Sequence, residues 1–464
     1  MTMAENYRLV MDVNKALRKA LPIRLGINKR NELTRLLYEI CISRNISPEK
    51  VLAEMPFSAS GDEKGGIFQR VKRDLVKTRY PELQKKDRVR LMPLKIDGES
   101  NESAVWRGEL EPRRIIVEKR SAGLEWTRGF LKMFPGAEVL ETDNIHRASK
   151  ELRLRDRIDG YALRRETIFI VSGKASFIKK CPCTKGAVRC GYWVLNLGFG
   201  CPFDCSYCYL QTYSNIPGLV FAANIEEYCG HIRKFDASQA RQVRIGTGEF
   251  TDSLALDKYT GYSSKLISVF RETKNLILEL KTKTADIDNV LKERAHPGVV
   301  ISWSINTPGI VEKYEKGTAG VYRRIEAAAL AASRGYKVGF HFDPVVWYEG
   351  WEKEYQDIVR RLFSHDKVRE NTVWISLGTL RYTPGLKQAA EQRFSDNRIF
   401  YEGGFFLDFD GKFRYPEKLR KEMYDKLLRY IKEAGVSCWT YLCMEPGGVS
   451  SGLEGLEKPA WPAS

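Results

Sequence analysis

The stretch GFGCPFDCSYCYLQ, residues 198–211, places three cysteines in a C-x-x-x-C-x-x-C spacing at Cys201, Cys205 and Cys208. It follows the apolar run YWVLNLG, which is typical of a buried strand. Six of the ten cysteines in the chain fall between residues 181 and 208. Cysteines clustered in this way indicate metal or redox chemistry rather than disulfides.

This spacing allows one loop to wrap three thiolates around a cube of iron and sulfide, so that the fourth iron keeps no protein ligand. Such an iron can chelate the amino and carboxylate groups of S-adenosylmethionine, and one electron from the cluster then releases a 5′-deoxyadenosyl radical. Gly198 and Gly200 allow the tight backbone that the loop needs. We therefore predict that Cys201, Cys205 and Cys208 bind a [4Fe-4S] cluster.

Two other kinds of site also use clustered cysteines, namely a zinc site and a closed four-cysteine cluster. Their fourth ligand would come from the segment KKCPCTKGAVRC, which contains Cys181, Cys183 and Cys190. Zinc ribbons usually have two separated C-x-x-C knuckles, whereas the single C-x-x-C here overlaps the triple. The spacing therefore favours the open cluster. For the three additional cysteines, packing in a turn and ligation of a second metal stay equally open.

After Cys208 the chain alternates short strand-like runs with helical ones, which predicts strand–helix units and a parallel sheet of the α/β class. The carboxyl ends of parallel barrel strands meet on one face, so the polar residues that end these strands should share one site. The strand-like runs are 242–250, 275–283, 299–306 and 337–345, and the helical runs are 263–273, 285–294 and 322–335. The polar strand ends are 246–249, 281–284, 304–307 and 341–343.

The first part of the chain has a different pattern, with apolar residues at helical spacing over 7–55 and a Ser-Pro helix start at 47–48. The turn-rich segment 58–66 is predicted as a linker and the polar segment 95–108 as a boundary. Beyond it, RRIIVEKR and ETIFIVSG are predicted as strands. We expect a basic, mainly helical accessory region at 1–108, a catalytic domain at 109–455 and a tail at 456–464.

Lysine and arginine outnumber aspartate and glutamate by 76 to 59, which gives a formal net charge of +17. A positive field attracts polyanions, so DNA is an expected partner, although a solvated basic surface explains the charge equally well. No apolar run is long enough to span a membrane and the start of the chain lacks a secretory signal, so we expect a cytoplasmic protein. The basic residues of the helical region that can contact phosphates are Arg18, Lys19, Arg24, Lys29 and Arg30.

The segment CPFDCSYCYLQ resembles the radical S-adenosylmethionine signature C-x-x-x-C-x-aromatic-C, in the CxYCYLQ form of spore photoproduct lyases. The resemblance covers residues 110–447. It implies a partial (β/α)6 barrel and a lyase that reverses a methylene-bridged thymine dimer in ultraviolet-damaged DNA. It also implies an electron donor such as a flavodoxin or ferredoxin. The other segments that carry it are RETIFIVSGK, LKTKTADIDNVL, SWSINT, RYPEKLRKEMYDKLLRYI and YLCMEP.

The resemblance also assigns cofactor contacts. It implies that the backbone near Tyr207 approaches the adenine. Lys283 and Ser304 match positions that contact the methionine end, where a cation and a hydroxyl suit a carboxylate and an amine. The cofactor-contacting motif of the second barrel strand is represented by Gly246, Gly248 and Glu249.

In the family, a cysteine returns a hydrogen atom to the lesion with the help of two tyrosines, which Tyr207 and Tyr209 match. The donor cysteine would follow the second barrel strand, but the corresponding segment GTGEFTDSLALD contains no cysteine. A radical enzyme acting on another nucleic acid or a small molecule is therefore an alternative, and a zinc- or cluster-stabilised nucleic-acid-binding module is a second one. The cysteines that can replace the donor, if the fold brings one near the cofactor, are Cys229, Cys438 and Cys443.

Two further polar pairs have both functional and structural interpretations. His341 and Asp343 end a strand and can assist proton transfer, although such a pair is more often structural. Arg381 and Tyr382, in TLRYTPG, can grip a phosphate or stack on a base, or can shape a loop before Pro384.

Overall fold

The structure of the chain is a computed structural model. The predicted linker at 58–66, the polar boundary at 95–108 and the tail at 456–464 lie largely outside the residues that it describes. The division of the chain at 108 and 455 therefore stays a prediction. The described residues are 2–21, 24–55, 66–85, 87–96, 105–156, 161–173, 177–213 and 216–456.

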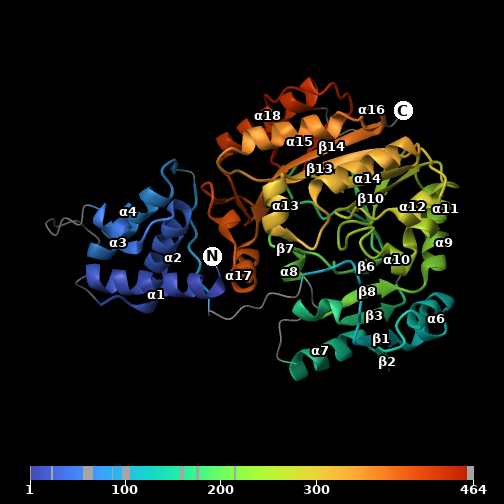
Figure 1. Ribbon diagram of the computed structural model, residues 1–464, viewed down its shortest axis with the longest axis horizontal. Coiled ribbons are helices and arrows are strands. Elements are labelled where there is room, and N and C mark those ends of the chain that lie inside the picture. Colours follow the sequence, from blue (N-terminus) through green and yellow to red (C-terminus); the bar gives the residue numbers. More distant parts are fainter. Residues whose placement is uncertain are drawn as a thin grey trace.

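A curled eight-stranded sheet lies at the centre of the molecule (Figure 1). Its neighbouring strands run parallel, except for the antiparallel pair β4 and β5 at one edge. The predicted α/β class and partial (β/α)6 barrel are confirmed, with each predicted strand after Cys208 in this sheet. In order across the sheet the strands are β18 (Trp439–Leu442), β14 (Thr372–Thr379), β13 (Lys337–Val345), β11 (Val299–Ser304), β10 (Leu276–Thr282), β9 (Val243–Gly246), β5 (Trp193–Leu195) and β4 (Ile178–Lys180).

Side chains alternate between the two faces of the barrel strands, as the two-residue period of a strand requires. In β10, Leu278 and Leu280 are buried in the main apolar core with the surrounding helices. Glu279, between them, accepts hydrogen bonds from Ser302 of β11 and Trp374 of β14. The inner face of the barrel is therefore polar, and its charged groups are paired across strands.

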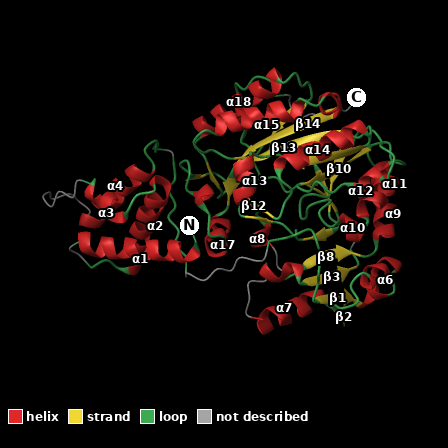
Figure 2. Ribbon diagram, viewed as in Figure 1, coloured by secondary structure: helices red, strands yellow, loops and turns green. Residues whose placement is uncertain are grey.

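Helices cover the outer face of the curved sheet (Figure 2). The predicted helices at 263–273 and 322–335 are confirmed as α11 and α14, whereas the one predicted at 285–294 is only the short helix α12, Asp288–Leu291. Among the described residues, no helix combines the length and apolarity that crossing a bilayer requires. The helices of this part are α8 (Leu210–Tyr213), α9 (Ile225–Ala237), α10 (Asp257–Thr260), α11 (Tyr262–Phe270), α12 (Asp288–Leu291), α13 (Pro308–Tyr314), α14 (Val321–Ser333), α15 (Trp351–Phe363), α16 (Asp366–Asn371), α17 (Pro384–Arg393), η2 (Arg398–Phe400), α18 (Glu417–Glu433) and α19 (Gly447–Ser450).

A second sheet of five strands packs beside the barrel, in the order β2-β1-β3-β8-β6. The predicted strands RRIIVEKR and ETIFIVSG are confirmed as β1 and β3, parallel neighbours in this sheet. There are two smaller sheets: β7 pairs with β12, and β17 pairs with β15 on one side and β16 on the other. The elements of this part and of the small sheets are β1 (Arg114–Glu118), α5 (Lys119–Ala122), α6 (Glu125–Lys132), β2 (Glu138–Thr142), α7 (Ile145–Asp156), η1 (Ala162–Arg165), β3 (Thr167–Val171), β6 (Gly198–Phe199), β7 (Asp204–Cys205), β8 (Leu219–Ala222), β12 (Glu315–Lys316), β15 (Arg381–Tyr382), β16 (Phe406–Leu407) and β17 (Phe413–Arg414).

The first part of the chain is helical, as predicted, and its apolar cluster also includes Tyr401 and Phe406 from the later part of the chain. The Ser47 hydroxyl accepts a hydrogen bond from the Lys50 amide at 3.3 Å, which confirms the predicted helix start. Buried charges join this helical unit to α17 of the barrel part: Arg35 donates to Glu391 at 2.9 Å. The helices are α1 (Met3–Ala20), α2 (Ile27–Arg44), α3 (Pro48–Ala53) and α4 (Gly66–Arg79).

Candidate metal centre and active site

The loop that carries Cys201, Cys205 and Cys208 runs from β6 to α8 and is fixed at its middle. There β7 pairs antiparallel with β12, with Cys205 opposite Glu315. Gly200 has a φ of 95°, a conformation that favours glycine, and a Cβ at this position would lie 3.0 Å from the Leu219 side chain. The three cysteines are therefore presented by one tightly folded loop.

Two buried arginines form hydrogen bonds with this loop and keep it in place. Arg164 donates to the carbonyl oxygens of Cys201 at 2.7 Å and Phe203 at 2.9 Å, and to the Asp204 carboxylate at 2.7 Å. Arg393, from α17, donates to the same carboxylate at 3.0 Å. No pattern in the sequence pointed to Arg164 or Arg393, because their segments lie far from the cysteine loop along the chain.

The three thiols share one buried neighbourhood. Burial raises the pKa of Cys201, Cys205 and Cys208, and repulsion between them adds to the shift for Cys201 and Cys205. Lys283 lowers the pKa of both Cys205 and Cys208. Metal ligation requires thiolates, so a cluster that binds to this loop would displace the protons that burial keeps on the three thiols. They thus fit the predicted [4Fe-4S] cluster.

The alternative zinc site requires ligands grouped around one ion. In the described part of the chain, no three His, Cys, Asp or Glu side chains are grouped so that they could hold a metal ion directly. Cys190 is engaged elsewhere, since its sulfur accepts a hydrogen bond from Arg244 at 3.3 Å. This finding also covers Cys201, Cys205 and Cys208, whose thiols are not grouped around one ion, whereas a cluster binds each thiolate through a different iron.

A charged network lies beside the cysteine loop and brings together three residues that the sequence singled out. Lys283 donates to Glu315 at 3.3 Å, and the Tyr207 hydroxyl donates to the same carboxylate. Arg324 donates to Glu315 at 2.6 Å and to the Ser304 carbonyl at 2.9 Å. Burial would raise the pKa of Glu315, but Arg324 and Lys283 hold it at about 2. Tyr207 and Lys283 therefore meet at an ionised glutamate, and the Ser304 carbonyl is linked to it through Arg324.

The end of β9 carries Gly246, Gly248 and Glu249 close to the cysteine loop. The Tyr209 hydroxyl donates to the Glu249 carbonyl. A Cβ on Gly246 would overlap the Tyr192 hydroxyl, and one on Gly248 would lie 2.8 Å from the Lys281 side chain. Both glycines are thus required by neighbouring side chains of the protein itself.

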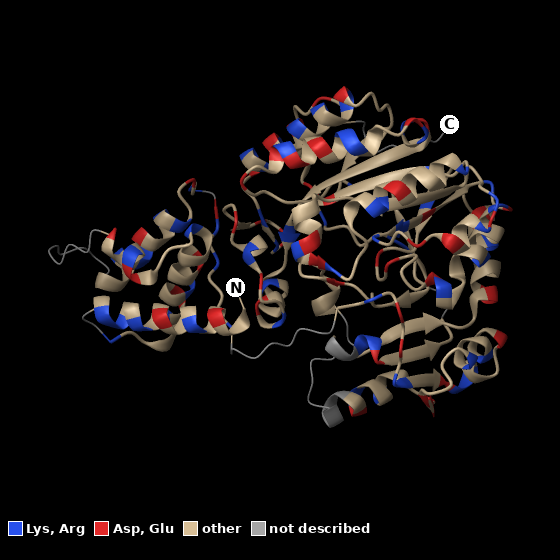
Figure 3. Ribbon diagram, viewed as in Figure 1, with Lys and Arg blue, Asp and Glu red and all other residues tan. Residues whose placement is uncertain are grey.

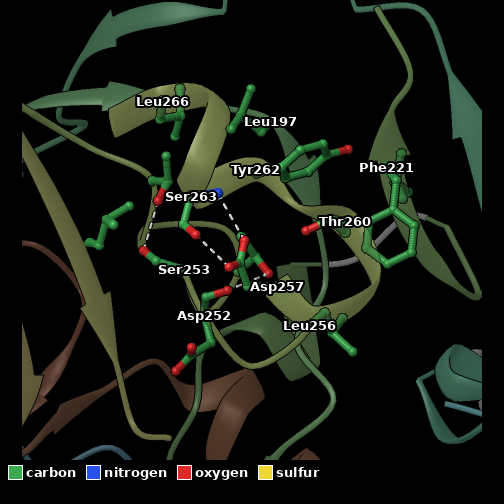
Figure 4. A pocket seen from close by; sticks show the side chains of 15 residues that line it. Leu197, Phe221, Asp252, Ser253, Leu256, Asp257, Thr260, Tyr262, Ser263 and Leu266 are labelled. Atoms are coloured by element: carbon green, nitrogen blue, oxygen red, sulfur yellow. Dashed lines mark hydrogen bonds between the residues drawn. The ribbon is translucent and has the colours of Figure 1, made fainter. Parts of the chain in front are cut away.

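Behind the loop that follows β9 lies a small pocket lined by residues from that loop, α10 and α11 (Figure 4). Its acidic groups are occupied: Asp257 accepts from the Ser263 amide at 2.8 Å, and Asp252 accepts from Thr282 at 2.6 Å. Asp252 also accepts from the Lys283 amide at 2.7 Å. These bonds support the loops that position the Lys283 network.

The remaining polar pairs lie inside the barrel and near its end. His341 bonds to Glu279 at 2.7 Å, and burial lowers the pKa of the imidazole. Asp343 forms two bonds with Arg381, at 2.9 and 3.1 Å. Tyr382 is only 2% exposed, which contradicts stacking on a base and agrees with the alternative, a role in shaping the loop before Pro384. Its ring packs between phenylalanines, which the loop sequence did not indicate.

Comparison with known proteins decides the family. A model of the family described as spore photoproduct lyase matches residues 112–434. The chain belongs to the spore photoproduct lyase family. The spore photoproduct lyase of Clostridium acetobutylicum is 25% identical over 321 residues, which cover 68% of this chain and 90% of the relative. The Bacillus subtilis spore photoproduct lyase is 25% identical over 297 residues, which cover 62% of this chain and 84% of the relative.

Solved structures agree on the fold. A spore photoproduct lyase variant with bound S-adenosylmethionine and dinucleoside spore photoproduct is 23% identical, with a TM-score of 0.61, and covers 72% of this chain and 100% of that one. A spore photoproduct lyase complexed with dinucleoside spore photoproduct is 22% identical, also with a TM-score of 0.61, and covers 72% and 99%. The resemblance of CPFDCSYCYLQ to this family is therefore confirmed by the family match, and the solved structures show that the fold is shared.

Because the chain belongs to the spore photoproduct lyase family, we compare the positions of the three cysteines that could replace the missing donor. Cys229 lies on α9 and packs in the outer apolar core, away from the barrel interior. Cys438 precedes β18, at the opposite end of that strand from the converging carboxyl ends. Cys443 directly follows β18, and its sulfur accepts a hydrogen bond from Arg381 at 3.7 Å. Of the three cysteines considered from the sequence, Cys443 is best placed.

Proposed function

We propose that this protein is a radical S-adenosylmethionine lyase that repairs the spore photoproduct in DNA. The observation that carries the proposal is the arrangement of Cys201, Cys205 and Cys208 on one buried loop beside the Lys283, Glu315 and Ser304 network. With both cofactors bound, the cluster and S-adenosylmethionine supply a 5′-deoxyadenosyl radical. On this proposal, the residues of the chain bind the two cofactors and orient them for that reaction.

The roles of the residues follow from their chemistry. Cys201, Cys205 and Cys208 bind the cluster, and Arg164 keeps their loop folded. The Lys283 ammonium forms a charge-assisted hydrogen bond with the cofactor carboxylate. Glu315 keeps that ammonium in place. On the same proposal Ser304 meets the cofactor amine, the backbone near Tyr207 approaches the adenine, and the β9 motif contacts the cofactor. The residues of that motif are Gly246, Gly248 and Glu249.

The substrate and partners are inferred from charge and from the relatives. Solved spore photoproduct lyases bind a dinucleoside lesion, and the net charge of +17 suits a DNA duplex. We assign phosphate contacts to Arg18, Lys19, Arg24, Lys29 and Arg30 of the helical unit. We further propose a flavodoxin or ferredoxin as electron donor, and a cytoplasmic location, where thiolate ligands stay reduced.

Anaerobic reconstitution tests the proposal. Reduced protein that carries four irons per chain is incubated with S-adenosylmethionine and ultraviolet-irradiated spore-type DNA. We expect 5′-deoxyadenosine and restored thymine, both measured by mass spectrometry, and neither from a Cys208→Ala control. Formation of 5′-deoxyadenosine without thymine would contradict the repair assignment.

A second candidate function is a radical reaction on a different nucleic acid or a small molecule. The observation that favours it is the loop after β9, where residues 246–257 contain no cysteine. On this alternative the protein cleaves S-adenosylmethionine but leaves the spore lesion intact. A nucleic-acid-binding module, by contrast, would form no 5′-deoxyadenosine under reduction.

A further inference from the structure

Two hydrogen-bond donors inside the barrel have no acceptor within the described part of the chain. The first is the hydroxyl of Tyr192, the residue directly before β5. Its side chain is only 8% exposed, and the hydroxyl bonds to none of the described residues. Buried hydroxyls are normally hydrogen-bonded, so an acceptor that enters the barrel with a ligand would stabilise this one.

The second donor is the ammonium of Lys281, at the carboxyl end of β10. Leu278 and Leu280 of this strand face the outer apolar core, whereas Glu279 faces the barrel interior. Because side chains alternate along a strand, Lys281 also faces the interior. Its side chain is partly buried. Among the residues that the structure describes, none forms a hydrogen bond or an ion pair with its ammonium.

The glycines at the end of β9 place the two donors next to each other. A Cβ on Gly246 would overlap the Tyr192 hydroxyl, and one on Gly248 would lie 3.1 Å from Cε of Lys281. Cε is the carbon that carries the ammonium. The hydroxyl and the ammonium therefore lie over two positions of one short segment, and each occupies the space that a missing side chain leaves.

The neighbouring charges of the barrel interior already have partners. Glu279 bonds to His341 at 2.7 Å. Asp343 forms two bonds with Arg381, at 2.9 and 3.1 Å. These carboxylates are thus engaged by other side chains, and Lys281 adds a positive charge that no bonded carboxylate neutralises.

The Lys281 ammonium is nevertheless held in its charged form. Burial lowers the pKa of Lys281, but the charges of Glu249, Glu279 and Asp343 raise it above its ordinary value. A charged ammonium has three N–H donors and no acceptor. Together with the Tyr192 hydroxyl, it suits the oxygen atoms of an anion, to which charge-assisted hydrogen bonds are strong.

We propose that Lys281 and Tyr192 form an oxyanion-binding site, and that its occupant is the phosphodiester that joins the two thymidines of the lesion. The inference rests on the proposed function and names the part of the substrate that the site takes. Thymine bases and deoxyribose are neutral, so the phosphate is the anionic group of such a substrate. Its unesterified oxygens can accept hydrogen bonds from both donors.

The carboxylate of S-adenosylmethionine is the competing anion. Lys283, just after β10, donates to Glu315 beside the cysteine loop at 3.3 Å, and the proposed function assigns the cofactor carboxylate to it. Lys281, by contrast, packs on Gly248 inside the barrel. The two lysines therefore serve different anions, and the affinity for the cofactor tells them apart.

The first test compares two lesions that differ only in the phosphate. Cluster-loaded, unreduced protein with S-adenosylmethionine is titrated calorimetrically with dinucleotide spore photoproduct, which has the phosphodiester, and with dinucleoside spore photoproduct, which lacks it. We expect wild type to bind the dinucleotide about tenfold or more tightly than the dinucleoside. Lys281→Met should bind both with the affinity of wild type for the dinucleoside. The matched control is Lys292→Met, which removes an exposed lysine and should behave as wild type.

Further variants separate ligand binding from a structural role. Tyr192→Phe should lower the affinity for the dinucleotide about threefold, without lowering the free energy of unfolding, because its hydroxyl has no partner in the described part of the protein. Lys281→Arg keeps the positive charge and should restore most of the preference for the dinucleotide. The affinity of Lys281→Met for S-adenosylmethionine should equal that of wild type.

The second test uses wild-type protein alone. Lysines of the cluster-loaded, unreduced protein are acetylated with an active ester, and the modified peptides are quantified by mass spectrometry. Saturating dinucleotide should slow acetylation of Lys281 about fivefold or more, because a bound phosphate occupies the ammonium. The dinucleoside should leave that rate unchanged, and the rate at Lys292 should not respond to either ligand.

The outcomes distinguish the two proposals. Equal affinities of wild type for the two lesions, an equal loss on both in Lys281→Met, or a loss of affinity for S-adenosylmethionine in that variant would overturn the phosphate site while leaving the proposed repair function intact. Equal acetylation of Lys281 with and without the dinucleotide would also overturn it. Wild-type protein that binds neither lesion would overturn the repair function and the phosphate site with it.

Discussion

Arg164 shows how much of the metal centre depends on a single buried residue. It bonds to two carbonyl groups of the cysteine loop and to Asp204. We expect Arg164→Met to weaken iron binding by about 10- to 100-fold, because outer partners of a metal site orient its ligands. The free energy of unfolding should also fall by about 3 kcal/mol, since Asp204 loses one of its buried partners.

The iron content per chain after dialysis against a chelator measures the effect of Arg164→Met on iron binding. Chemical unfolding measures its effect on stability. Arg113→Met is the matched control, because the Arg113 side chain, just before β1, is 82% exposed. Equal iron content in the two variants would show that Arg164 does not support the cluster.

Lys283 offers a second test at the scale of one residue. On the proposed function its ammonium contacts the cofactor carboxylate, so Lys283→Met should weaken S-adenosylmethionine binding by about 10- to 100-fold. Iron content should stay unchanged, because Arg324 still neutralises Glu315 at 2.6 Å. Calorimetric titration of the reconstituted, unreduced protein measures the affinity, with the exposed residue substituted in Lys292→Met as control. An unchanged affinity would contradict the assigned contact.

At the scale of elements, α2 and α17 are joined by buried charges rather than by an apolar seam alone. Lys387 of α17 and Arg79 of α4 donate to Glu39 of α2 at 2.6 and 3.1 Å. We expect Glu39→Gln to lower the free energy of unfolding at neutral pH by about 3–5 kcal/mol, because two buried cations lose their carboxylate.

The same substitution has a defined pH dependence. Burial would raise the pKa of Glu39, but Lys387 and Arg79 hold it at about 2, against an ordinary value of 4.5. A lowered carboxyl pKa stabilises the fold fully above the ordinary value and loses that effect as the pH falls through the native one. The difference between wild type and Glu39→Gln should therefore shrink from pH 4.5 to pH 2. Urea unfolding over this range measures it, and a constant difference would rule out the linkage.

Helices and strands with strong local sequence patterns could be predicted, but the segments that they pair with could not. The apolar runs in β10 and β11 and the helical spacing in α14 are local signals, so these elements appear where the sequence predicted them. The strands β1 and β3 were also predicted, but their separate sheet depends on pairing with β8, which local pattern does not encode. The spacing of Cys201, Cys205 and Cys208 likewise predicted that one loop carries all three.

The supporting residues of the site were beyond local reasoning for the same reason. Glu315 meets Cys205 only because β12 pairs with β7, and Arg393 reaches Asp204 from a helix almost two hundred positions later. The sequence left two roles open for Tyr382, and its packing against Phe400 and Phe405 favours the structural one. Each case is decided by contacts between segments that are distant along the chain.

For the whole molecule, charge and architecture bear on how a duplex is held. Lys and Arg are spread over both parts of the protein, with acidic residues between them (Figure 3). Arg18 and Lys19 are both exposed in the last turn of α1, in the helical unit beside α17 (Figure 1). If this unit contacts DNA, it does so through phosphates beyond the lesion. A dinucleoside substrate would then not need it.

That difference gives a prediction for the intact protein. We expect Arg18→Glu combined with Lys19→Glu to weaken binding of irradiated duplex DNA about tenfold at low salt, and to reduce the slope of log affinity against log salt by about 1.8 for two lost phosphate contacts. Thymine formation from the dinucleoside lesion should equal that of wild type. The matched control, Arg128→Glu with Lys132→Glu, reverses two exposed charges on α6. Equal duplex affinities for the two double variants would exclude a specific DNA contact by the helical unit.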